Sequence, residues 1–167
     1  MGQRHRLTVP LFLLNLKGIS PDISIIEYNG GGYLQMIKWD DKFIIGVDII
    51  DQQHKELFRI ANDAYSLLKS EFYTDKYDKV VQLIEELKNY AVFHFETEEN
   101  YMMEIGYKKF LSHKVVHDDF VEKVKKVNLE HMDENQDEYL TSILMFVVDW
   151  IENHILKTDK QIEIKGQ

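Results

Sequence analysis

Cysteine is absent from this chain of 167 residues, and proline occurs only twice. Without cysteine there can be no disulfide, no iron–sulfur cluster and no covalently attached c-type haem. The absence also fits a reducing compartment, so we expect a cytoplasmic protein. The sequence has no run of 18 apolar residues either, which argues against a membrane-spanning helix.

Positive charge is scarce relative to negative charge. The chain has 20 Lys and Arg against 29 Asp and Glu, which gives a net charge of −9. An acidic chain without a basic patch binds nucleic acid poorly, and the short run Lys123–Lys126 is interpreted as a solvated helix face. We therefore expect no nucleic-acid or membrane partner. The hydrophobic fraction of 44% is enough for one buried core.

Residues 1–35 differ from the rest of the chain. They contain both prolines and the glycine run Gly30–Gly32. Their basic start is followed by a short apolar run, Leu11–Leu14, but a small-residue cleavage site typical of signal peptides is missing. Two interpretations stay open: the natural product starts at Met36, or the stretch is a disordered or weakly packed tail. We assign it no chemistry and expect one domain over residues 36–167.

Five of the seven histidines form a metal-ligand pattern with two carboxylates. The pattern consists of His54, His94 with Glu98, His113 with His117, and His154 with Asp159. Two residues four apart on a helix point about 40° apart, so such a pair can hold one metal ion. Five imidazoles and two carboxylates are too many for one zinc ion and suit two iron ions bridged by the carboxylates inside a helix bundle. A single HxxxH pair would be weak support, but the joint pattern favours a site.

The apolar periodicity predicts an all-α fold with four helices. These cover about residues 48–72, 75–105, 108–129 and 136–160, after an extended arm over 38–47 that bends at Gly46. Short connections imply antiparallel neighbours, hence an up-down-up-down antiparallel four-helix bundle with an N-terminal extended arm.

Helix ends are predicted from capping chemistry. Asp48 or Asp51 is expected to cap the first helix and Thr74 or Asp75 the second, since their carboxylate or hydroxyl oxygens can accept from free N–H groups. Gly106 is expected to end the second helix as a C′ glycine.

Two details of the pattern need an explanation from the structure. His154 and Asp159 are five residues apart, which is about 140° on an ideal helix, so the last turn must wind differently or Asp159 must reach around. The ligands are also flanked by apolar side chains. We expect most of these side chains in the core and some of them to line a pocket large enough for a gas molecule. These are Phe93, Phe95, Val115, Val116, Ile155 and Leu156.

The residues resemble those of the hemerythrins, in particular the single-domain bacterial ones. The similarity covers about Met36 to Lys160. It includes Trp39, the FIIGVDIIDQQHKEL stretch, and the HFxxEE, HKxxH and WxxxHIxxxD motifs. Lys108 stands where the family often has proline, a minor departure at a helix first turn.

This resemblance implies a carboxylate- and oxo- or hydroxo-bridged di-iron centre. One iron would take His113, His117 and His154, and the other would take His54 and His94. Glu98 and Asp159 would bridge the two, with a solvent-derived third bridge. The two-histidine iron would keep an open position, where dioxygen would bind and be held as hydroperoxide.

The implied function is reversible dioxygen binding for transport, storage or delivery, without enzyme activity. The ligand groups lack the Glu-x-x-His pairs of oxygen-activating bundles, which favours reversible binding. The alternatives are an oxygen or redox sensing module, a slow di-iron oxidase or a peroxide- or NO-consuming enzyme, and iron handling. His5 and His131 are interpreted as exposed bystanders, and no protein partner is indicated.

Overall fold

The computed structural model describes residues 38–71, 76–127 and 136–162. Residues 1–35 with His5, the predicted caps Thr74 and Asp75, and His131 lie outside the described residues. The helices of the described part are α2 (Asp48–Leu68), α3 (Lys76–Glu104), α4 (Phe110–Lys125) and α5 (Gln136–Lys157), with 3-10 turns η2 (Asp41–Phe43) and η3 (Asp159–Ile162). No strand occurs within these ranges.

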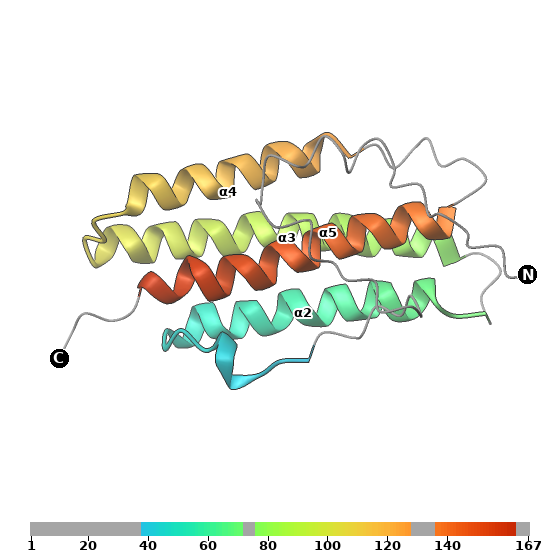
Figure 1. Cartoon of the computed structure of the whole chain (residues 1–167), viewed down its shortest axis with the longest axis horizontal. Helices are drawn as coiled ribbons and strands as arrows, with labels where there is room; N and C mark the ends of the chain where they lie inside the picture. Colours follow the sequence, from blue (N-terminus) through green and yellow to red (C-terminus); the bar gives the residue numbers. More distant parts are fainter. Residues whose placement is uncertain (1–37, 72–75, 128–135, 163–167) are drawn as a thin grey trace, which may run out of the picture. The chain divides into compact units, whose positions relative to one another are not determined.

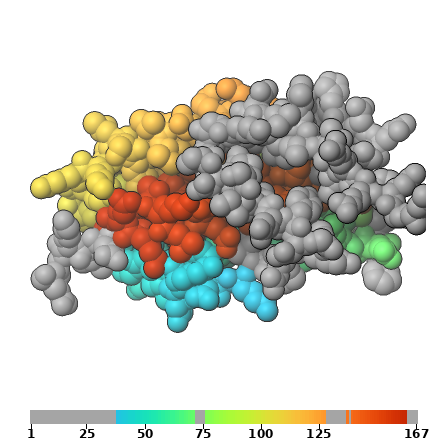
Figure 2. All heavy atoms as spheres, viewed as in Figure 1, coloured from blue at the N-terminus to red at the C-terminus, as the bar shows by residue number. Residues whose placement is uncertain are grey.

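The four helices form an antiparallel bundle, as predicted (Figure 1). Helix α2 packs against α3 and α5, and α3 packs against α4 and α5. In the space-filling view, side chains of α5 lie between those of α4 and α2 (Figure 2). Within the described ranges, none of the helices combines the length and apolar character that a membrane crossing requires.

Each helix buries one stripe of residues at helical spacing, and the predicted ligands lie on those stripes. On α3 the buried apolar residues Val80, Ile84, Leu87 and Ala91 continue directly into His94 and Glu98. On α4 the stripe runs from His113 and His117 to Phe120 and Val124. A buried aliphatic side chain contributes roughly 1.5–3 kcal/mol, so the apolar part of each stripe stabilises the packing that holds the polar part in place.

The start of α2 differs from the prediction, since neither Asp48 nor Asp51 caps it. Val47 precedes the helix and makes no side-chain cap. The Asp51 carboxylate instead accepts from the backbone N–H groups of Ile45 at 2.8 Å and Gly46 at 3.0 Å. Gly46 has φ +87°, a left-handed bend that glycine adopts without steric cost. The predicted bend at Gly46 is confirmed, and Asp51 ties it to α2.

The arm that precedes α2 is only partly extended. The 3-10 turn η2 interrupts it, and Asp40 caps that turn by accepting from the backbone N–H of Lys42 at 2.9 Å. Phe43 is fully buried, with its ring centroid 4.9 Å from that of Phe58 in an edge-to-face arrangement. The ring of Trp39 lies 5.8 Å from Phe43, so aromatic packing holds the arm on the bundle.

The end of α3 is the glycine-terminated motif that the sequence predicts. Gly106 has φ +63°, its N–H donates to the carbonyl of Met103 at 3.2 Å, and the Tyr107 N–H donates to that of Met102 at 2.9 Å. This is the Schellman arrangement, which reverses the chain in few residues. Helix α4 therefore starts close to the end of α3 and runs back along it.

Three of the helices are shorter than predicted. Helix α2 ends at Leu68, where the Lys76 amine donates to the Leu68 carbonyl at 2.7 Å and satisfies one of the last carbonyls. Helix α4 covers only Phe110–Lys125, and α5 ends at Lys157.

Candidate metal centre

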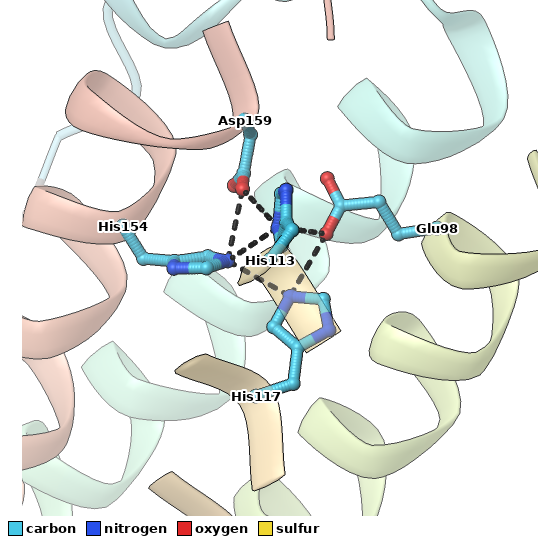
Figure 3. A group of neighbouring side chains, drawn as sticks. All are labelled: Glu98, His113, His117, His154 and Asp159. Atoms are coloured by element: carbon cyan, nitrogen blue, oxygen red, sulfur yellow. Dashed lines mark hydrogen bonds and ion pairs between the residues drawn. The ribbon is translucent and has the colours of Figure 1, made fainter. Parts of the chain in front are cut away.

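The seven predicted ligands converge inside the bundle from all four helices and η3. Each of them is at most 5% exposed. Five of them point toward one another in Figure 3, from α3, α4, α5 and η3: Glu98, His113, His117, His154 and Asp159. A polar group this deeply buried is costly unless it has a partner, so the convergence calls for a ligand.

The donor atoms fall into two overlapping sets. One set contains Glu98, His113, His117, His154 and Asp159, and the other contains His54, His94, Glu98 and Asp159. Within each set the donor atoms lie within 4.8 Å of one another. Both carboxylates belong to both sets, so they are placed to bridge two cations.

We call the part of the cluster formed by His113, His117 and His154 the three-histidine side. There the Nε2 atoms of the imidazoles lie close to one another. The Nε2 atom of His154 lies 3.1 Å from that of His113 and 2.9 Å from that of His117. Glu98 Oε2 is 3.2 Å from His117 Nε2, and Asp159 Oδ1 is 2.9 Å from His154 Nε2. Lone-pair nitrogens and carboxylate oxygens that face a common point are the donors of an iron site.

On the two-histidine side, His54 and His94 come from the neighbouring helices α2 and α3. Their rings lie edge to face with centroids 4.7 Å apart. Asp159 Oδ2 lies 3.4 Å from His54 Nε2, which links this side to the other.

Asp159 reaches the cluster because the α-helix stops before it. The last α-helical residue is Lys157, and the Thr158 N–H donates to the His154 carbonyl at 2.8 Å. The chain then winds as the 3-10 turn η3, which begins at Asp159 and is anchored by the buried Ile162. The expectation that the last turn winds differently is confirmed.

Two residues that the sequence analysis missed stand behind the ligands. The Nδ1 atom of His94 lies 3.1 Å from Gln53 Oε1, and the Nδ1 atom of His117 lies 3.1 Å from Glu99 Oε1. Glu99 also contacts Lys114 at 3.1 Å. Such outer partners orient a ligating imidazole and fix its tautomer. The sequence did offer one indication of these two residues. Gln53 directly precedes His54, and Glu99 directly follows Glu98.

Burial and charge act differently on the histidines. Burial lowers the pKa of His94 to about 3, so this ring is neutral with a free lone pair. Burial also opposes charge on His113, but contacts with Asp159 and Glu98 outweigh burial and raise the pKa of His113 to about 9. Without a metal ion, a proton on His113 supplies positive charge between two buried carboxylates, and a bound cation would take its place.

The two carboxylates show most directly what the cluster is suited to hold. Glu98 and Asp159 are fully buried, and within the described part of the chain their oxygens form no hydrogen bond of regular geometry, although imidazole nitrogens lie 2.9–3.5 Å away. Burial favours the neutral form of Glu98, yet contacts with His113 and His117 hold the pKa of this carboxyl below its usual range. Two buried anions among five imidazoles fit a pair of divalent or trivalent cations.

Aromatic rings enclose the three-histidine side. The ring of Phe95 stacks on His117 with centroids 4.0 Å apart, and Trp150 stacks on His154 at 4.4 Å. Phe95 and Ile155 are buried as expected. The other flanking apolar residues are not in the core: Phe93 is 53% exposed and Val115 58%, and Val116 and Leu156 are also exposed. Residues one or two positions from an inward ligand are rotated about 100–160° from it, so closeness to a ligand in sequence does not by itself place a side chain in the core.

Comparison with known proteins identifies the group to which the chain belongs. The family model described as Hemerythrin HHE cation binding domain matches residues 45–163. The chain belongs to the hemerythrin family. A bacteriohemerythrin of Clostridium acetobutylicum is 52% identical over 126 residues, which span 75% of this chain and 98% of that protein.

Less similar hemerythrins also match this chain. A myohemerythrin of Theromyzon tessulatum is 33% identical and covers 73% of this chain and 87% of its own length. A crystal structure of wild-type hemerythrin superposes with a TM-score of 0.61 at 27% identity, covering 76% of this chain and 95% of that one. Hemerythrins are di-iron proteins, and the buried cluster supplies donors for such a centre, as predicted from the sequence.

Proposed function

We propose that this protein binds dioxygen reversibly at a non-haem di-iron centre, for oxygen transport, storage or delivery, and that it is not an enzyme. The proposed ligands of one iron are His113, His117 and His154, and those of the other are His54 and His94. Glu98 and Asp159 would bridge the two. The absence of cysteine from the sequence favours a cytoplasmic location.

The single observation that carries the proposal is the pair of buried donor sets that share Glu98 and Asp159. A structural site for one ion would use a single closed set. Two sets with common carboxylates instead provide places for two ions side by side, with negative charge between them. A ferrous pair held by these residues would supply the two electrons that dioxygen needs to bind, and would regain them when dioxygen leaves.

The two sides are unequal in protein ligands, and this inequality gives the site its function. His113, His117 and His154 contribute three imidazoles on one side, whereas His54 and His94 contribute two on the other. The two-histidine side is therefore one protein ligand short. A site with an unfilled position accepts an exogenous molecule, whereas a filled one does not.

The donor set favours reversible binding over oxygen cleavage. Oxygen-activating di-iron bundles use four Glu residues, two of which belong to Glu-x-x-His motifs. Here five neutral imidazoles accompany only two carboxylates, so the site is less anionic and supports high oxidation states less well. Burial of every ligand keeps bulk water from the reduced centre.

An optical spectrum recorded over repeated cycles of oxygen and argon, together with an iron count, tests the proposal. We expect two irons per chain and a spectrum that returns to its starting form after each argon flush. One-way oxidation would instead favour a sensor or a peroxide- or NO-consuming enzyme. Fewer than two irons, or a single tightly bound zinc, would contradict the site itself.

A further inference from the structure

A chain of three hydrogen bonds lies behind His94 and joins α3 to α2. The Thr97 hydroxyl donates to the backbone carbonyl of Phe93, one turn earlier on α3, at 3.0 Å. The Gln53 amide nitrogen donates to the Thr97 hydroxyl oxygen at 3.1 Å. The Gln53 carbonyl oxygen lies 3.1 Å from His94 Nδ1. Gln53 is only 4% exposed, so it is withdrawn from solvent.

The Thr97 hydroxyl determines which group donates and which accepts in each of these hydrogen bonds. A backbone carbonyl only accepts, so the single hydroxyl proton of Thr97 is committed to Phe93. The hydroxyl oxygen can then only accept, and Gln53 must turn its NH₂ group toward it. The carbonyl oxygen of Gln53 therefore faces His94, and His94 must provide the proton from Nδ1.

We propose that Gln53 is a positioning residue that holds His94 in its Nδ1–H tautomer, and that Thr97 holds Gln53 in the orientation this requires. The other ring nitrogen of His94, Nε2, is then left with a lone pair for a metal ion. The inference rests on the proposed di-iron function, because the lone pair matters only when His94 is a ligand.

The three-histidine side does not need such a chain. His117 has Glu99 behind it, and an ionised carboxylate accepts in either orientation. An amide, by contrast, has a donor end and an acceptor end, so Gln53 needs Thr97 to choose between them. Among the described residues, the Nδ1 atoms of the remaining three ligand histidines have no hydrogen-bond partner: His54, His113 and His154.

The orienting role is tested by two substitutions in the full-length, iron-loaded protein. Gln53→Leu removes the acceptor, and Thr97→Val removes the hydroxyl while keeping the shape of the side chain. We measure irons per chain and the rate at which each iron passes to a chelator under argon. Gln53→Leu should speed the loss of one of the two irons about 10–100-fold, the usual range for an outer partner, and leave the other in place. Thr97→Val should act in the same direction with a smaller effect.

A double-mutant comparison separates orientation from packing. With Gln53→Glu the residue behind His94 accepts in either orientation, so this variant should keep both irons at wild-type rates of loss. Adding Thr97→Val to Gln53→Glu should then have no further effect on iron loss. A packing role for Thr97 would instead give the same effect in both backgrounds. Thr97→Ser, which keeps the hydroxyl, serves as the matched control and should resemble the wild type.

The outcomes that overturn the inference are distinct from those that overturn the proposed function. Wild-type rates of iron loss in Gln53→Leu, or an equal effect of Thr97→Val with Gln and with Glu at position 53, would refute the orienting chain alone. Wild-type protein that binds fewer than two irons would refute the proposed function and this inference with it. Thr97→Val changes so little volume that the test remains available if Gln53→Leu fails to fold.

Discussion

The two sides of the cluster are built on the same inward stripes but are held differently. The three-histidine side draws on α4 and α5, is enclosed by stacked aromatic rings, and has a carboxylate, Glu99, behind one ligand. The two-histidine side draws on α2 and α3 and has a neutral amide, Gln53, behind one ligand. One bundle can thus combine a donor set enclosed by aromatic rings with a neighbouring set that has one imidazole fewer, because only the two carboxylates are shared.

The largest effect should come from removing a shared group. We expect Glu98→Ala to lose both irons and to melt at a lower temperature than His54→Ala. Glu98 lies in both donor sets, so its loss removes negative charge between two cations and leaves imidazoles without a metal. Buried polar groups without partners cost about 1–3 kcal/mol each. Iron content and melting temperature, measured side by side, decide the matter, and equal metal retention in both variants would show that Glu98 is not a bridge.

An intermediate effect should come from removing one imidazole on either side. His54→Ala should release or loosen one iron, while the three-histidine iron partly persists, because only His54 and His94 anchor that side by imidazoles. His154→Ala should be less selective, since His154 Nε2 contacts both other imidazoles and Asp159. The measurement is iron per chain after dialysis against a chelator. The same number of irons per chain in both variants would show that the two sides do not differ in how they hold iron.

A smaller effect should come from the outer partner on the three-histidine side. Glu99→Gln keeps the hydrogen bond to His117 only when the amide presents its oxygen, and it removes the negative charge behind the ring. We expect loss of the three-histidine iron to a chelator to quicken about 10-fold, at the low end of the range for such partners. Glu96→Gln, an exposed change on the same helix, is the control and should leave both rates unchanged. Faster loss of the other iron instead would contradict the assignment of Glu99 to this side.

The smallest effect should come from deleting residues 1–35. All seven proposed ligands lie between His54 and Asp159, and the described core lies between Phe43 and Ile162. A shortened chain beginning at Met36 should therefore keep two irons, the same optical spectrum and the same melting temperature. Lost iron or a lower melting temperature would show that the first 35 residues support one side of the cluster.

Helical spacing was enough to predict much of the site. His113 and His117 are one turn apart, as are His94 and Glu98, and local periodicity alone places each pair on one face. The irregular place of Asp159 was also foreseen, because five residues do not return to the same face of an α-helix. Its solution, a 3-10 turn, required the structure.

What spacing could not predict depends on contacts between distant segments. Gln53 meets Thr97 and His94 across 44 and 41 residues of sequence, so their pairing follows from the register between α2 and α3 and not from any local pattern. The predicted cap at Asp51 was wrong for a related reason. The left-handed bend at Gly46 turns two N–H groups back toward the helix, and the carboxylate serves them instead.

The 3-10 turn at Asp159 has a consequence for how the protein is made in the cell. Asp159 is the last of the seven proposed ligands in the order of translation, and it belongs to both donor sets. A nascent chain that has been synthesised only as far as the end of α5 carries all five imidazoles. It carries only one of the two shared carboxylates, Glu98. The proposed pair of metal sites, with both shared carboxylates, is therefore complete only after this turn has been synthesised.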